Sequence, residues 1–165
     1  MKLAIDIAGT VISLVNGRLL PRNSHPHIRY QDIPAVHGAC DHLTWLFNNM
    51  GDNLLLVAGI PYRDKNSQDR VLTWLQDSNM LQRTRIKAYS VHFLLEREQD
   101  ETDLCNRLGV THFVGNRAKY LPLNGVDNLY LLNPLPNEEK AALSRFEKPV
   151  KKIPSWANIF EVLGI

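Results

Sequence analysis

The 165-residue sequence has only two cysteines, a small net charge and no long apolar run. Cys40 and Cys105 lie far apart and lack Cys-x-x-Cys spacing, so we expect buried, reduced thiols. A net charge of +2 is too small to indicate nucleic-acid binding by itself. No apolar run is long enough to span a membrane, and the N-terminus lacks the long apolar core of a signal peptide. These absences predict a cytoplasmic protein with no membrane association.

The composition is that of an ordinary globular protein. Charged residues make up 22% of the chain and hydrophobic residues 44%, values near the average that favour neither disorder nor a membrane class. A chain of this length suits one domain with a sizeable core. We therefore predict a single domain over residues 1–165.

Apolar runs alternate with helical patterns along the chain. Strands are predicted for the run that ends at Asp6 and for residues 53–59, 88–93, 111–114 and 128–132. Helices are predicted over 35–49, 67–77, 99–108 and 117–121, then one capped by Asn137 and one capped by Ser155. Such alternation predicts parallel pairing through right-handed crossovers. The expected fold is an α/β three-layer sandwich around a five-stranded, Rossmann-like parallel sheet.

Two further patterns refine this picture. Asn16-Gly17 stands between apolar runs, and both residues tolerate positive φ, so a tight hairpin is predicted directly after the first strand. The tryptophans Trp45, Trp74 and Trp156 fit the apolar stripes of the predicted helices. We expect all three in the core and give none a ligand role.

A ligand crevice is expected at the carboxyl ends of the first, second and fourth strands. Those ends carry three short segments: 6–10, 58–59 and 115–116. Asp6 supplies the carboxylate of the first segment. The simplest alternative for Asp6 is a strand-end residue that caps the turn before Gly9.

The pattern Asp-x-x-Gly-Thr at residues 6–10 resembles the first motif of the haloacid dehalogenase (HAD) superfamily of phosphohydrolases. That motif is an apolar strand followed by Asp-x-Asp-Gly-Thr. The resemblance extends over nearly the whole chain and includes segments 109–114 and 130–134. It implies a HAD-like sheet, a small flap hairpin, and a minimal cap or none, because no long insertion follows the flap. It also places Asp6 at the position of the family's nucleophile.

Four of the five functional positions that the resemblance implies carry unsuitable residues. They are the general acid/base, at Ala8; the phosphate-binding hydroxyl, at Ala58 and Gly59; the lysine, at Glu101; and the Mg²⁺ carboxylates, at Gly115 and Asn116. Loss of a positioned acid/base alone typically costs a factor of about 10²–10⁴. The residual phosphate donors are weak backbone N–H groups, at Gly9, Thr10, Ala58 and Gly59. Any metal would have Asp6 and Asn116 as ligands, and Lys87 or Arg97 replaces the lysine only if a loop is displaced.

These losses predict a HAD-like pseudoenzyme that lacks phosphatase activity and acts as a binding or regulatory module. We expect no cofactor, with Mg²⁺ needed only if activity remains. Either a small ligand in the vestigial pocket or a protein partner then carries the function. The alternative is a residual HAD-type phosphohydrolase that acts on a small phosphomonoester or nucleotide with Asp6 as nucleophile. In that alternative either the substrate supplies its own acid, or His112 or His92 is recruited as acid/base, since histidine has a suitable pKa.

Two weaker signals remain. Basic residues cluster over 83–87 and 145–152, as in phosphate-contacting surfaces, but acidic residues nearly balance them, so nucleic acid is an unlikely partner. His25 and His27 flank a proline and resemble metal ligands, but no further ligand pattern accompanies them. We favour surface histidines in a loop.

Overall fold

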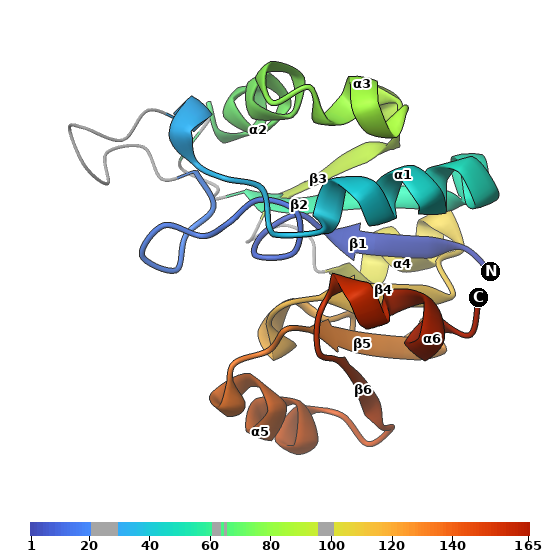
Figure 1. Cartoon of the computed structure of the whole chain (residues 1–165). Helices are drawn as coiled ribbons and strands as arrows, with labels where there is room; N and C mark the ends of the chain where they lie inside the picture. Colours follow the sequence, from blue (N-terminus) through green and yellow to red (C-terminus); the bar gives the residue numbers. More distant parts are fainter. Residues whose placement is uncertain (21–29, 61–63, 65, 96–100) are drawn as a thin grey trace.

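The structure is a computed structural model, and it describes residues 1–20, 30–60, 64, 66–95 and 101–165. A six-stranded sheet forms the centre, in the order β3-β2-β1-β4-β5-β6, and every neighbouring pair is parallel (Figure 1). Its strands are β1 (Leu3–Asp6), β2 (Leu54–Ile60), β3 (Val91–Leu95), β4 (His112–Gly115), β5 (Asn128–Leu132) and β6 (Val150–Ile153). The predicted α/β class with a parallel sheet is confirmed.

The sixth strand, β6, is absent from the five-strand prediction. Its sequence is Val-Lys-Lys-Ile, in which two exposed lysines separate Val150 from the fully buried Ile153. A four-residue segment of this kind has neither an apolar run nor a clear alternation. Because β6 is an edge strand that pairs only with β5, its lysines can reach water.

Helices cover both faces of the sheet (Figure 1). One core lies between the sheet and the helices α1, α2, α3 and α6. A second core on the opposite face includes residues of α4 and α5. The helices are α1 (Ala39–Met50), α2 (Ser67–Asp77), α3 (Met80–Thr84), α4 (Glu101–Leu108), α5 (Pro136–Arg145) and α6 (Ile159–Leu163). This is the three-layer arrangement that the alternating pattern predicts.

The central strand, β1, is buried along its whole length between β2 and β4. Leu3 and Ile5 contribute to the first core, whereas Ala4 contributes to the second. Because side chains alternate along a strand, Asp6 projects to the same face as Ala4, which is the face that α4 covers. The end of β1 therefore directs its carboxylate toward the start of α4.

Several element boundaries differ from the prediction. Helix α1 begins at Ala39 because residues 34–36 bond to the loop after β1: Ser13 N–H donates to the Pro34 carbonyl, and Val36 N–H to the Val11 carbonyl. Helix α5 begins at Pro136, so Asn137 lies inside the helix and is not its cap. A single 3-10 turn, η4 (Ala118–Tyr120), replaces the short helix expected over 117–121. Helix α2 has the predicted bounds.

The loop after β1 is a compact turn followed by the predicted hairpin. Three successive N–H groups, of residues 10–12, donate to the carbonyl of Ile7. Val15 and Arg18 then exchange two hydrogen bonds of 3.0 Å across Asn16-Gly17. Asn16 has φ +48° and Gly17 has φ +72°, as a two-residue turn with both positions left-handed requires.

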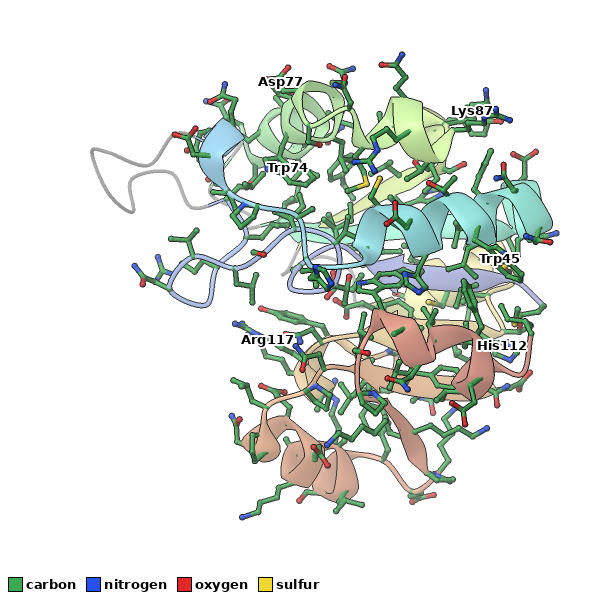
Figure 2. All side chains as sticks on the ribbon, in the orientation of Figure 1. Trp45, Trp74, Asp77, Lys87, His112 and Arg117 are labelled. Carbon is green, nitrogen blue, oxygen red and sulfur yellow. The ribbon has the colours of Figure 1, made fainter. Side chains whose placement is uncertain are left out.

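The three tryptophans divide into two buried residues and one exposed residue. Trp74 donates its indole N–H to the Ile33 carbonyl, and Trp156 donates to the Thr10 carbonyl. Trp45 is 40% exposed on α1, where its ring contacts Phe160 (Figure 2). The prediction that all three lie in the core is therefore wrong for Trp45. An apolar stripe indicates which face of a helix packs against the protein, but it does not show how deeply each side chain is buried.

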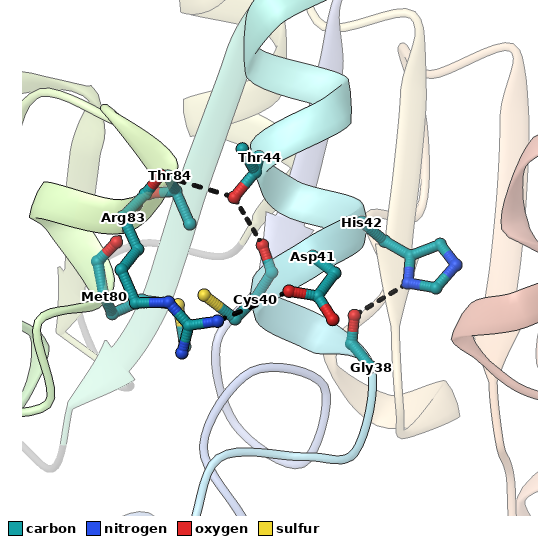
Figure 3. Close-up of polar contacts among 8 residues, drawn as sticks. All are labelled: Gly38, Cys40, Asp41, His42, Thr44, Met80, Arg83 and Thr84. Atoms are coloured by element: carbon teal, nitrogen blue, oxygen red, sulfur yellow. Dashed lines mark hydrogen bonds and ion pairs between the residues drawn. The ribbon is translucent and has the colours of Figure 1, made fainter.

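Polar contacts hold α3 against α1 (Figure 3). Thr44 Oγ1 donates to the Cys40 carbonyl at 2.8 Å and to the Arg83 carbonyl at 3.4 Å. Arg83 also pairs with Asp41 at 3.4 Å. Cys105 is buried, whereas Cys40 is half-buried, and burial raises the pKa of the Cys40 thiol, which keeps it protonated. The prediction of buried thiols is therefore confirmed for Cys105 and wrong for Cys40.

Candidate functional site

A pocket of about 600 Å³ lies at the carboxyl ends of β1, β2 and β4. This is the place where the alternating pattern predicts a ligand crevice. Its charged residues come from five different segments and include both signs: Asp6, Arg18, Asp64, Arg70, Glu101, Arg117 and Lys119. Its apolar residues include Leu14, Leu19, Val57, Phe113 and Tyr120.

Asp6 is the buried carboxylate of this pocket, with 5% of its surface exposed. Burial raises its pKa from 3.8 to about 7, because a charged carboxylate loses its hydration there. A hydrogen bond from Ala8 N–H to Asp6 Oδ1, 3.2 Å long, opposes this rise. The charge of Glu101 raises the pKa further, and that of Arg117 lowers it. Near neutral pH, Asp6 is thus present in both protonation states.

Two of the substituted positions stand beside Asp6. Ala8 lines the pocket, and so does Glu101, the first residue of α4. Ala8 offers a methyl group, which can neither donate nor accept a proton. Glu101 brings a negative charge to the carboxylate that a lysine would neutralise. Compared with the motif that the resemblance implies, this place therefore has no acid/base side chain at residue 8 and no cation at residue 101.

Asn116, which follows β4, makes contacts within the fold. Asn116 Nδ2 donates to the carbonyls of Leu132, at 3.1 Å, and Asn133, at 3.3 Å. Its Oδ1 lies so close to Gly9 that a Cβ built there would be 2.7 Å away. Asn116 therefore joins the loops after β1, β4 and β5.

The Mg²⁺ ion that the resemblance implies does not fit these residues. Magnesium prefers several oxygen ligands in octahedral geometry, usually including carboxylates. The Asn116 amide is engaged with the loop after β5, and Gly115 has no side chain. In the described ranges no three carboxylate, histidine or cysteine side chains gather into a group that could hold a metal ion. Among the six strands, β1 alone carries a carboxylate, that of Asp6.

The four residues with candidate phosphate-binding N–H groups lie in different surroundings. Gly9 N–H donates to the Ile12 carbonyl at 2.9 Å, and Thr10 N–H donates to the Ile7 carbonyl at 3.4 Å. Ala58 is fully buried within β2, and Gly59 lines the pocket. Ile7 N–H donates a hydrogen bond to the Val57 carbonyl of β2. Because the backbone groups of alternate residues in a strand point to the same side, the backbone N–H and C=O of Gly59 also point to this side, beyond the end of β1.

The cations of the pocket were not found from the sequence. Arg18 lies in the hairpin, whereas Arg117 and Lys119 follow β4. Arg117 Nη2 donates to the Gly17 carbonyl at 2.6 Å, which ties the hairpin to the segment after β4. Lys119 Nζ lies 4.3 Å from the ring centroid of Tyr120. None of these residues belongs to a strand-end motif, so the sequence held no spacing that would group them.

A fourth cation, Arg70 on α2, is already paired. It forms a salt bridge with Asp64, and the two side chains are 11% and 18% exposed. It also donates to the Leu20 carbonyl at 3.2 Å and to Ser67 Oγ at 3.1 Å. Arg70 therefore links α2 to Leu20 and to Asp64, which pairs with its charge.

The other candidates from the sequence lie elsewhere. His112 begins β4 and Lys87 precedes β3, so both lie at the amino end of the sheet, while Arg117 lies at the carboxyl end (Figure 2). Burial lowers the pKa of His112, and its Nδ1 contacts Thr111 Oγ1 at 2.9 Å. Because they lie at the opposite end of the sheet, neither His112 nor Lys87 can act on Asp6.

His92 lies within β3, where burial lowers its pKa. Arg97, His25 and His27 are outside the described residues.

Three basic residues of the two clusters have partners within the chain. Arg83 pairs with Asp41, and Lys152 pairs with Glu139 at 2.6 Å. Lys148 donates to a backbone carbonyl, that of Val126.

Comparison with known proteins gives no family assignment. No protein-family model matches the chain, and no curated protein matches it. Among the described residues, every helix is too short or too polar to cross a membrane. The function is therefore inferred from the residues of the pocket and from the motif that Asp6 begins.

Proposed function

We propose that the chain is a HAD-like pseudoenzyme, a binding or regulatory module whose pocket holds a small ligand and performs no phosphoryl transfer. The observation that carries this proposal is the surroundings of Asp6. Its neighbours in the pocket include the methyl group of Ala8 and the carboxylate of Glu101, while Asn116 is bonded to the loop after β5.

The electrostatics support the same conclusion. A phosphoryl group carries negative charge, and its transfer requires compensation of the charge that develops in the transition state. Glu101 adds charge of the wrong sign, and the residues after β4 do not fit Mg²⁺. Burial holds the pKa of Asp6 at about 7, so near neutrality much of this carboxyl group is protonated and non-nucleophilic.

One observation favours a second candidate, a residual phosphohydrolase with Asp6 as nucleophile. Arg18, Arg117 and Lys119 line the same pocket. Arginine binds phosphate oxygens bidentately, so these side chains could compensate a phosphate without a metal ion. The substrate class in this case is a small phosphomonoester or a nucleotide.

Phosphatase activity separates the two candidates. The wild type and Asp6→Asn are assayed with an aryl phosphate and a panel of nucleotides and sugar phosphates, with and without Mg²⁺. We expect no turnover above the Asp6→Asn background. Turnover that disappears in Asp6→Asn contradicts the pseudoenzyme proposal and supports the second candidate.

Ala8→Asp is the matched gain-of-function variant. It supplies the missing acid/base carboxylate but leaves Glu101 and Asn116 unchanged. We expect it to stay inactive, since Glu101 still brings charge of the wrong sign and the residues after β4 still do not fit Mg²⁺. Turnover in this variant that depends on Asp6 would show that Ala8 is the single defect, and the explanation based on charge would then be wrong.

A further inference from the structure

One edge of the sheet, at β6, is open to another strand. Asn133 N–H donates to the Ile153 carbonyl at 2.8 Å, so the backbone groups of Ile153 point toward β5. Because these groups alternate in direction along a strand, those of Val150 and Lys152 point away from β5. Among the described residues, no strand lies beyond β6, and no loop or turn forms a backbone hydrogen bond with Val150 or Lys152. The N–H and C=O groups of both residues are therefore available for pairing.

A groove of about 430 Å³ accompanies this edge. It lies between β6 and α5, which are neighbours in the fold (Figure 1). Its apolar lining includes Ala142, Leu143, Phe146 and Val150, and of these Leu143 is 83% exposed. It shares no lining residue with the pocket of Asp6. Because side chains alternate between the faces of a sheet, a chain paired with β6 would direct every second side chain into this groove.

The two lysines of β6 lie on opposite faces of the sheet. Lys152 pairs with Glu139 of α5 at 2.6 Å, on the face with the groove. On the other face, Lys151 Nζ lies 5.7 Å from the ring centroid of Tyr130, a residue of the first core. Within the described part of the chain, Lys151 forms no salt bridge. Its exposed charge therefore stands beside the open edge without an acidic partner there.

The charge around this edge selects between possible partners. Residues 145–152 include four basic side chains and one acidic side chain. A second copy of the chain would bring its own two lysines against those of β6, and like charges opposite one another destabilise a strand pair. A strand with acidic side chains gains attraction at the same positions.

We propose that the β6 edge binds an extended acidic segment of a partner protein, which adds a further strand to the sheet. Apolar side chains of this segment enter the groove beside Leu143, and alternate Asp or Glu side chains face Lys151. Hydrogen bonds to the main chain of β6 provide affinity, and the alternation of side chains provides specificity. A nucleic acid could use only the lysines, since it has neither apolar side chains for the groove nor N–H donors at strand spacing.

Fluorescence anisotropy with labelled peptides of about eight residues, an ordinary strand length, tests this inference. The probe alternates glutamate with valine. One control alternates lysine with valine, and the other has the probe's composition with all glutamates placed before all valines. We expect the probe to bind at least about tenfold more tightly than either control, because only the probe meets both the charge and the groove.

N-methylation tests the backbone pairing without a change in the protein. One modified probe carries N-methyl groups on its valines, and the other carries them on its glutamates. In a paired strand, the N–H groups of one set point toward β6 and those of the other set point away. We expect one modified probe to bind at least about tenfold more weakly and the other to bind as the probe does. Equal affinities of the two modified probes would overturn the inference.

Two pairs of variants locate the site. Lys151→Glu should weaken binding of the probe by about tenfold, whereas Lys87→Glu, at an exposed lysine before β3, should leave it unchanged. Leu143→Ser should also weaken binding by about tenfold. Its control is Leu135→Ser, at a leucine that is 66% exposed next to the start of α5 and outside the groove. Thermal unfolding of each variant verifies its fold.

Three further results would overturn the inference. The first is a probe that binds no more tightly than its controls, or that Lys151→Glu and Lys87→Glu weaken equally. The second is displacement of the probe by single-stranded oligothymidylate together with equal binding of the two N-methylated probes, which would identify a nucleic-acid surface. The third is a dimer in sedimentation equilibrium that Leu143→Ser dissociates, because a second copy would then cover the edge.

Discussion

The two ends of the sheet treat their polar groups in opposite ways. At the amino end, Thr111 Oγ1 accepts a bond from Lys2 N–H at 3.0 Å and donates to the Lys2 carbonyl at 3.2 Å. At the carboxyl end, Asp6 is buried with a raised pKa. There too, among the described residues, the buried Thr10 Oγ1 has no hydrogen-bond partner. The polar groups at the amino end therefore stabilise the fold. Those at the carboxyl end are buried at a cost in stability, as is common around binding sites.

The largest expected effect concerns Asp6. Below pH 3.8 the carboxyl group is protonated in both the folded and the unfolded chain, so it costs nothing. Between pH 3.8 and about 7 the unfolded chain releases this proton first, and stability falls as the pH rises. Above that window the full cost of about 4 kcal/mol remains. Asp6→Asn should therefore exceed the wild type in stability by about this amount at pH 8, and by little near pH 4.

Urea unfolding of both proteins at the two pH values measures this difference. Asp127→Asn, which removes an exposed carboxylate near the amino end of the sheet, is the control and should stay within about 0.5 kcal/mol of the wild type. A difference between wild type and Asp6→Asn that does not change with pH would contradict the raised pKa. It would also remove the contrast between the two ends of the sheet.

Much of the scaffold could be predicted because it depends on local patterns. The apolar run before Asp6 and the runs over 54–60 and 128–132 are buried strands, whatever their neighbours do. The hairpin could be predicted from Asn16-Gly17, because the left-handed backbone of such a turn depends on these two residues alone. β6 could not be predicted, since two of its four residues are lysines that an edge strand tolerates.

Only those residues of the pocket that lie at or near strand ends, or that follow the spacing of the resemblance, could be predicted from the sequence. The position of Asp6 follows from β1, and the spacing of the resemblance led to Glu101, which lines the pocket as well. Arg18 and Arg117 meet there through the hairpin and the bond to the Gly17 carbonyl. That meeting is tertiary and leaves no periodic trace in the sequence. The sequence therefore indicated Asp6 and Glu101 as neighbours in the pocket, and it missed the cations.

The next largest effect compares two left-handed glycines. Gly9 has φ +76° at the carboxyl end, and Gly109 has φ +66° after α4 at the amino end. Alanine at either position pays about 1–2 kcal/mol for the left-handed backbone. At Gly9 the new Cβ also meets Asn116 Oδ1 at 2.7 Å, whereas at Gly109 it meets nothing within 4 Å. We expect Gly9→Ala to cost about 3 kcal/mol and Gly109→Ala about 1 kcal/mol, measured by urea unfolding.

A double-mutant cycle isolates the contact. Asn116→Ala removes the obstructing side chain and also its bonds to the loop after β5. If the clash is responsible, Gly9→Ala should cost at least about 1 kcal/mol less in that background than alone. Equal costs for Gly9→Ala with and without Asn116 would show that backbone strain is the whole effect, and that the loops after β1 and β4 are not packed as described.

The smallest effect tests the contrast with one substitution made at both ends. Valine keeps the shape of threonine and lacks its hydroxyl group. Thr111→Val removes two hydrogen bonds to the backbone of Lys2 together with the contact to His112 Nδ1, and it should destabilise the protein by about 1 kcal/mol. Thr10→Val removes a buried hydroxyl that has no partner among the described residues and should stabilise it by about 1 kcal/mol. Opposite signs in thermal or urea unfolding support the division between a satisfied and an unsatisfied end. A loss of stability in Thr10→Val as large as that in Thr111→Val would mean that the Thr10 hydroxyl is bonded after all, and the difference between the ends would then reduce to Asp6 alone.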